Sequence, residues 1–228
     1  MLQHVHSIAA RPVMPMIPDR HGGVGEVSFA GIRLMGVCSM TARDTEVFGE
    51  GEPADHLYAV VSGAVRTYKI TQDGRRQICA FLLPGDVFGL ELGENYSLTA
   101  EAVCDSVLAV AKRRTLNGLA ERDAEVARRL WVMAAGQLEA ARAHMLLLGR
   151  QCAHERVAAF LLDLQGRLGS GAHVALPMSR NDIADYLGLT IETVSRTLSQ
   201  FDKAGTIALR TSRHVEVLSR GALRALVG

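Results

Sequence analysis

The sequence predicts an α+β protein with an N-terminal antiparallel β-roll, one long helix and a C-terminal winged helix-turn-helix. Three observations predict this fold. Short runs of Val, Leu, Ile and Tyr between residues 27 and 111 are cut by glycine turns, residues 115–148 lack proline and are rich in helix formers, and two short amphipathic helices with a glycine turn follow residue 179. We expect a flexible arm at 1–25, the β-roll at 26–114, the long helix at 115–149 and the winged unit at 150–228.

Composition places the chain among ordinary globular proteins. It has 228 residues, of which 48% are apolar, and no apolar run long enough for a membrane helix, so we expect a soluble, cytoplasmic protein. Residues 1–149 carry 15 Lys and Arg against 17 Asp and Glu, whereas residues 150–228 carry 10 against 7. This mild excess of positive charge is typical of a domain that faces phosphates. Cys38, Cys79, Cys104 and Cys152 are too widely spaced to suggest a zinc site, so we expect free thiols and no metal.

Three runs give the clearest strands of the β-roll: residues 57–61, 64–70 and 77–83. Turns such as Ser62-Gly63, Asp73-Gly74 and Pro84-Gly85-Asp86 separate them. Short strands at this spacing favour an antiparallel sandwich or barrel.

Apolar residues recur along the long helix at alternating steps of four and three. The positions are Ala127, Trp131, Ala134, Leu138, Ala141, Met145, Leu148 and Cys152. Such a heptad pattern indicates a seam between two helices, and the small alanines allow close approach of a second copy. We therefore expect a homodimer held by Trp131, Leu138, Met145 and Leu148. Periodicity alone leaves open a helix that packs only on its own β-domain.

The helix-turn-helix follows from capping chemistry. Ser179, with Asp182 three residues later, forms a capping box that starts a helix over 180–187. Gly188 can adopt the left-handed backbone that ends it. Thr190 can cap a second helix that runs from 191 to about 204 and ends before Gly205.

The second helix has two distinct faces. Its predicted buried positions are Ile191, Val194, Leu198 and Phe201, and its predicted outer positions are Glu192, Ser195, Arg196 and Ser199. In a major groove, Arg196 could donate twice to guanine and Glu192 could accept from the cytosine amino group. An ordinary solvated face with a Glu–Arg pair is the alternative. The partner of this surface would be double-stranded DNA.

Residues around this helix are candidates for phosphate contacts. They are Thr190, Thr193, Ser179, Arg180 and, on a β-hairpin formed by 207–210 and 214–218, Arg210, Arg213 and His214. A plain surface hairpin and a cap with no DNA contact are the alternatives. If Ser179 does face a phosphate, Ser179→Asp should weaken DNA binding at least about tenfold while stability stays near wild type, because the new charge suits the helix dipole.

Two strings of residues resemble the CRP/FNR superfamily of bacterial regulators. They are Leu-Pro-Gly-Asp-Val-Phe-Gly over 83–89 and Asp-Ile-Ala-Asp-Tyr-Leu-Gly-Leu-Thr-Ile-Glu-Thr-Val-Ser-Arg over 182–196. The resemblance extends from about residue 27 to 226. It implies a homodimer that regulates transcription with RNA polymerase and reads TTGA-type half-sites through Glu192, Ser195 and Arg196.

Two departures narrow the resemblance to FixK-type activators. Residues 1–37 contain no cysteine for an iron–sulfur cluster, and Leu90 and residues 97–100 lack the glutamate and arginine of cyclic-nucleotide members. The resemblance then implies an activator of low-oxygen respiration or nitrogen-fixation genes that works with no cofactor. A nucleotide or haem sensor of the same fold, with His56 as the one histidine of the strand region, remains the alternative. We find no catalytic constellation, so an enzyme is not expected.

Overall fold

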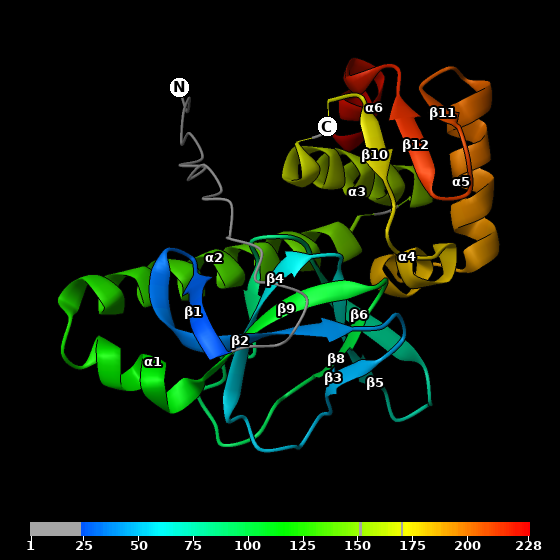
Figure 1. The fold of residues 1–228 in the computed structure, drawn as a ribbon. Helices are drawn as coiled ribbons and strands as arrows, with labels where there is room; N and C mark the ends of the chain where they lie inside the picture. The colour runs from blue at the N-terminus through cyan, green and yellow to red at the C-terminus, as the bar shows by residue number, and fades with distance from the viewer. Residues whose placement is uncertain (1–23, 151, 170) are drawn as a thin grey trace.

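The structure, a computed structural model, describes residues 24–150, 152–169 and 171–228 (Figure 1). Nearly all of the predicted arm, residues 1–23, lies outside the described residues. Its last two residues, Val24 and Gly25, already belong to the first strand, so the β-region begins earlier than expected.

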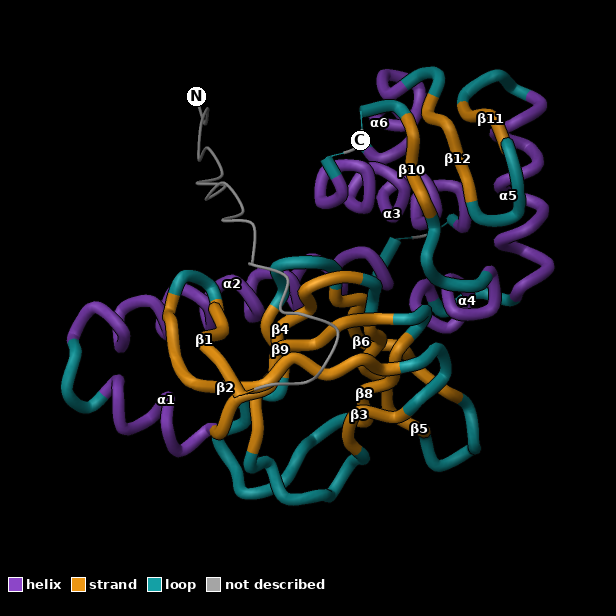
Figure 2. Tube along the Cα trace, in the orientation of Figure 1, coloured by secondary structure: helices purple, strands orange, loops and turns teal. Residues whose placement is uncertain are grey.

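The N-terminal region is the predicted antiparallel β-roll. Its strands are β1 (Val24–Phe29), β2 (Ile32–Thr41), β3 (Glu46–Phe48), β4 (His56–Ser62), β5 (Val65–Ile70), β6 (Arg76–Leu82), β7 (Val87–Phe88), β8 (Thr99–Ala102) and β9 (Ser106–Lys112). One sheet has the order β1-β2-β9-β4-β7 and the other β3-β8-β5-β6. The three strands predicted most clearly from the sequence are β4, β5 and β6, and their predicted ends are confirmed to within one residue. Figure 2 shows these strands apart from the C-terminal ones.

Gly63 makes the sharp turn between β4 and β5. Its φ is +86°, and a Cβ there would lie 2.2 Å from Oγ of Ser106 and 2.7 Å from the Asp105 carbonyl oxygen. Only glycine combines this left-handed backbone with such a close approach. The turn is what brings β5 into the second sheet.

The expected single helix over 115–148 is wrong, because the structure has two helices there. They are α1 (Arg113–Ala120) and α2 (Ala124–Leu148). Asp123 has extended backbone (φ −132°, ψ 107°), and its carboxylate accepts the amide protons of Glu125 and Val126. Asp123 is thus the N-cap at which a second helix, α2, begins. The stretch is predicted as one helix because it contains no proline.

The C-terminal region packs helices on a small sheet. It contains α3 (Ala153–Leu168), β10 (His173–Ala175), α4 (Arg180–Leu187), α5 (Ile191–Lys203), β11 (Ile207–Leu209), β12 (His214–Val217) and α6 (Arg220–Val227). Its first helix, α3, thus starts three residues after the predicted beginning of the winged unit at residue 150. The expected hairpin of β11 and β12 gains β10 as a third strand, in the order β10-β12-β11.

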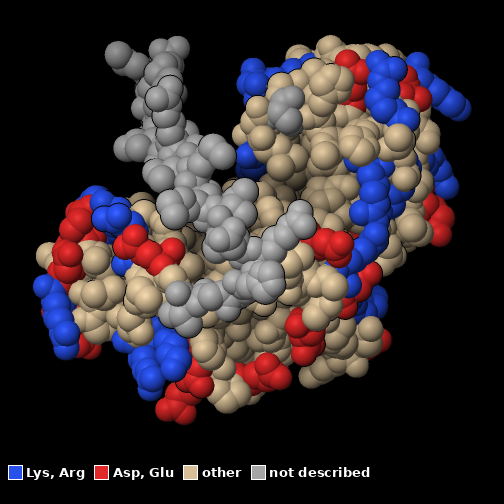
Figure 3. Space-filling view, in the orientation of Figure 1, with Lys and Arg blue, Asp and Glu red and all other residues tan. Residues whose placement is uncertain are grey.

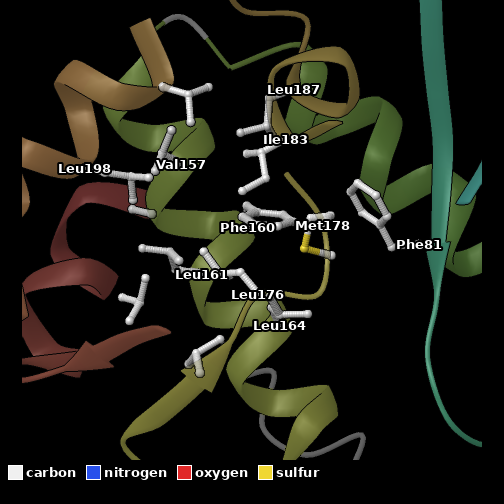
Figure 4. Close-up of a cluster of buried hydrophobic side chains, with 14 of the residues drawn as sticks. Phe81, Val157, Phe160, Leu161, Leu164, Leu176, Met178, Ile183, Leu187 and Leu198 are labelled. Carbon is white, nitrogen blue, oxygen red and sulfur yellow. The ribbon is translucent and has the colours of Figure 1, made fainter. Parts of the chain in front are cut away.

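A continuous apolar core joins the C-terminal region to the β-roll. Phe160, Leu161 and Leu164 of α3 form its centre, and each is at most 4% exposed. Ile78 and Phe81 of β6 belong to the same cluster. Figure 4 shows Phe81 pointing from the β-roll toward Phe160. Within the described residues, no helix is both long and apolar enough to cross a membrane.

Candidate DNA-binding surface

The first helix of the motif, α4, starts at the predicted capping box. The amide of Asp182 donates to Oγ of Ser179 at 3.1 Å, and the amide of Ser179 donates to Oδ2 of Asp182 at 2.9 Å. The helix ends at Gly188, whose φ of +60° is the left-handed conformation. Both predicted ends of α4 are therefore confirmed.

The second helix, α5, is capped as predicted by Thr190. Its Oγ1 accepts the amide proton of Thr193 at 3.3 Å and lies 3.1 Å from the Thr193 hydroxyl. Arg156 of α3 holds the connecting turn, because its Nη1 donates to the carbonyl oxygens of Leu187 and Gly188 at 3.1 and 3.3 Å. No local pattern predicts this contact, since Arg156 is distant in the chain from the turn that it holds.

The buried face of α5 differs from expectation at one residue. Val194, Leu198 and Phe201 are at most 4% exposed, as predicted, but Ile191 is 41% exposed. Ile191 is the first residue of the helix and projects past the core, whereas Thr197 takes a buried place at 2%. The prediction that Ile191 is buried was wrong.

On the outer face of α5, Glu192 and Arg196 are exposed and Ser195 is half-buried. No ion pair within 4.0 Å joins Glu192 to Arg196 among the described residues, so the Glu–Arg pair of the alternative reading is not formed. The backbone amide of Glu192 and the hydroxyl of Thr190 hold the pKa of the Glu192 carboxyl below its usual value. The Glu192 carboxylate and the Arg196 guanidinium thus both face solvent, one helical turn apart. Figure 3 shows Lys and Arg side chains near α4 and α5, with Asp and Glu side chains among them and other basic side chains at the opposite end of the molecule.

The basic side chains of the wing are partly engaged within the chain. Arg210 pairs with Glu216, its Nε donating at 2.8 Å. Nη1 of Arg213 donates to the carbonyl oxygen of Pro177 at 2.8 Å. Nδ1 of His214 lies 3.1 Å from the Thr211 hydroxyl. Arg180, the other basic candidate, is half-buried at the start of α4.

Sequence reasoning missed the contact that joins α4 to the β-roll. Arg66 of β5 is only 6% exposed, and its Nη1 donates to Oδ1 of Asp182 at 3.0 Å. Arg76 of β6 donates from Nη2 to the same oxygen at 2.7 Å and from Nε to Asp185 at 2.9 Å. Nothing local distinguishes Arg66 or Arg76 from a surface arginine, so only the tertiary structure could reveal this contact.

Among the residues that the structure describes, none covers one face of α2. Trp131 is 75% exposed, Leu138 52% and Met145 66%, and Leu148 is half-buried. The opposite face packs on the β-roll through the partly buried side chains of Val126, Leu130 and Met133. The two readings of the heptad pattern are therefore not exclusive, because α2 packs on its own domain and still presents an apolar stripe.

In the segment after β7, where a cyclic nucleotide would need a cation, Tyr96, Glu91 and Ser97 bind partners within the chain. Tyr96 is 3% exposed, stacks on Phe48 with ring centroids 3.7 Å apart and donates its hydroxyl to the His56 carbonyl oxygen at 2.7 Å. Glu91 accepts from the amide and hydroxyl of Ser97 at 3.2 and 2.9 Å. Residues 87–102 contain no Lys or Arg.

Comparison with known proteins identifies the class. A Crp-like helix-turn-helix domain matches residues 155–226 and a cyclic nucleotide-binding domain matches residues 41–123, together more than half of the chain. The chain therefore belongs to the CRP/FNR family of transcriptional regulators, with a DNA-binding helix-turn-helix, as its sequence predicts.

Within that family the chain is of the FixK type. The nitrogen fixation regulation protein FixK of Azorhizobium caulinodans is 50% identical over 86% of this chain and 81% of its own. FixK of Rhizobium meliloti is 46% identical over 79% and 82%. The solved structure of FixK2 from Bradyrhizobium japonicum is 51% identical and covers 86% of this chain and 98% of its own, with a TM-score of 0.83. These relatives are named as regulators, in agreement with the expectation that the chain is not an enzyme.

Proposed function

We propose that the chain is a homodimeric activator that reads a TTGA-type palindrome with α5 of each copy and needs no bound effector. The carrying observation is the outer face of α5, where Glu192 and Arg196 are exposed and form no ion pair with each other within 4.0 Å. A carboxylate can accept from a cytosine amino group, and a guanidinium can donate twice to guanine. Ser195 lies beside them, and Thr190, Thr193, Ser179, Arg180 and Arg213 are the proposed phosphate contacts.

The apolar stripe of α2 supports the homodimer. Trp131, Leu138 and Met145 expose large apolar side chains in a single copy, which is costly in water. An isologous pairing of two α2 helices would cover both stripes at once and relate the two α5 helices by a two-fold axis. That symmetry suits a palindrome whose half-sites lie about one helical turn of DNA apart.

The proposed targets come from the relatives. FixK proteins carry nitrogen fixation regulation in their names, which supports genes of nitrogen fixation or low-oxygen respiration as targets. An activator must recruit or contact RNA polymerase, which is the proposed further partner. It would act in the cytoplasm, where its DNA lies.

Selection of bound sequences from random double-stranded DNA, with purified cofactor-free protein, tests the proposal. We expect enrichment of a palindrome with TTGA-type half-sites. A requirement for an added nucleotide or haem before any sequence is enriched would favour the ligand-switched sensor. Thermal-shift measurements with cyclic nucleotides and haem separate the same two readings, because a ligand stabilises the state that binds it.

A further inference from the structure

The start of α4 is fixed to the β-roll by a buried ionic network. Arg66 and Arg76 both donate to Oδ1 of Asp182. Oδ2 of the same carboxylate accepts from the amide and the hydroxyl of Ser179 at 2.9 and 2.7 Å. Arg66 also pairs with Glu101 and, at 3.4 Å, with Asp44 of the β-roll. Asp182 therefore caps α4 and anchors it to β5 and β6 with one side chain.

A second group of contacts surrounds this network. Arg76 reaches Asp185, one turn further along α4, and the side-chain amide of Gln77 donates to the Asp185 carbonyl oxygen at 2.9 Å. The ring centroid of Phe81 in the β-roll lies 5.1 Å from the ring centroid of Tyr186 on α4. Figure 1 shows α4 against the end of the β-roll that carries β6. The interface has a packed apolar part and an ionic part, and so resists the domain motion usual for small polar interfaces.

Burial of an arginine among carboxylates is poor evidence for added stability, because desolvation offsets much of the attraction. The better-attested role of a buried ionic network is to select one packing arrangement of the elements that it joins, since its directional hydrogen bonds are satisfied in only one geometry. Here the selected geometry is the placement of α4 on β6. The reading face of α5 remains exposed in that geometry, with Glu192 and Arg196 turned to solvent.

We propose that Arg66 and Arg76 are positioning residues for DNA reading. They fix the helix-turn-helix on the β-roll in the orientation that binds DNA, and so replace the effector that would set this orientation in a ligand-switched regulator. This inference rests on the proposed effector-free function, which it deepens by naming the contacts that make an effector unnecessary.

Asp185→Asn is the decisive variant, because two explanations predict opposite signs. Removal of a negative charge would tighten DNA binding if electrostatic attraction alone mattered. Loss of the Arg76 pair should instead weaken specific binding about tenfold, which is the effect of 1.4 kcal/mol. Asp185 is not the capping residue, so α4 keeps its box. Tighter or unchanged specific binding by this variant would overturn the proposal.

Arg76→Gln and the double variant, which combines Arg76→Gln with Asp185→Asn, complete a double-mutant cycle. Because Arg76 also donates to Asp182, Arg76→Gln should lose at least as much specific affinity as Asp185→Asn, and the double variant should lose no more than Arg76→Gln, within about twofold. Additive losses would show that the two residues act separately and would overturn the proposal. Arg75→Gln is the matched control: Arg75 is adjacent, its side chain is 83% exposed, and it pairs with Asp73 in its own turn. The affinity of Arg75→Gln for the specific DNA site should stay at the wild-type level.

Hydrogen exchange without DNA separates failure of this inference from failure of the proposed function. Amides of α4 and β6 should exchange faster in Arg76→Gln and Asp185→Asn than in wild type and Arg75→Gln, while those of β1 and β2 should not change. Wild-type protein that selects no DNA sequence would refute the proposed function, yet the exchange comparison would still report the contact. Unchanged exchange in both variants would overturn the positioning role.

Discussion

Ser179 and Asp182 cap each other, and the Ser179 hydroxyl also donates to Oδ2 of Asp182 at 2.7 Å. A carboxylate at 179 would lie beside the Asp182 carboxylate. The expectation that Ser179→Asp keeps wild-type stability, which considered only the helix dipole, therefore needs revision. Like charges in contact oppose the favourable dipole term.

Ser179→Asp should unfold at a lower temperature than Ser179→Ala, which itself should lose about 1 kcal/mol, the usual value of a serine cap. Ser219, the N-cap of α6, is the matched control, because α6 has no acidic residue in its first turn. Ser219→Asp should keep its stability. Calorimetry of the three variants and the wild type checks this, and equal melting temperatures for the two aspartate variants would contradict it.

The DNA effect of position 179 is measured separately. Ser179→Asp should bind the specific site at least about tenfold more weakly than Ser179→Ala at moderate salt, because its charge would face a phosphate. Equal affinity of the two variants would show that Ser179 only caps α4.

Leu138→Glu should give monomers, because it places a charge in the centre of the apolar stripe of α2. Leu138 is 52% exposed in one copy, so the monomer should still fold. Trp131, the only tryptophan, reports the change: its emission should shift to the solvent-exposed value as the dimer dissociates. Sedimentation checks the mass, with Leu138→Met as the control that should remain dimeric. A dimeric Leu138→Glu would place the interface elsewhere.

Glu192→Ala and Arg196→Ala should each cost about 1–3 kcal/mol of discrimination per half-site, since each removes a base-edge contact. Binding to non-specific DNA should change much less. Ser199→Ala is the control on the same outer face, because the Ser199 hydroxyl already donates to the Ser195 carbonyl oxygen at 2.9 Å. Binding titrations against specific and scrambled sites decide the matter. An equal loss on both sites would mark these residues as phosphate contacts.

The contribution of Glu192 should survive mild acidification. Its folded-state pKa is lowered, first by its own backbone amide and then by Thr190. A depressed pKa keeps the carboxylate ionised as the pH falls through the usual glutamate range, so the acceptor is lost only below that range. The discrimination of wild type over Glu192→Ala, measured from pH 7 down to about pH 4, should stay nearly constant. A loss of discrimination within that interval would contradict the lowered pKa.

Local chemistry let the sequence predict most of the helix-turn-helix. Ser179, Gly188 and Thr190 act through backbone groups at most a few residues away, so spacing alone located both helix ends. The same reasoning located β4, β5 and β6 from their glycine turns. It failed at Asp123, where a cap within a proline-free stretch divides the expected helix, and at Ile191, whose exposure depends on where the core ends.

The sequence by itself thus determined the local elements and the chemistry of the reading face, because caps, turns and helix periodicity act over short stretches of chain. Only the tertiary structure decided how these elements are placed. Arg66 and Asp182 are 116 residues apart, and neither carries a local mark of the other. Their contact exists because the two β-sheets and the core around Phe81 bring β5, β6 and α4 together, and long-range packing of this kind leaves no periodic pattern in one sequence.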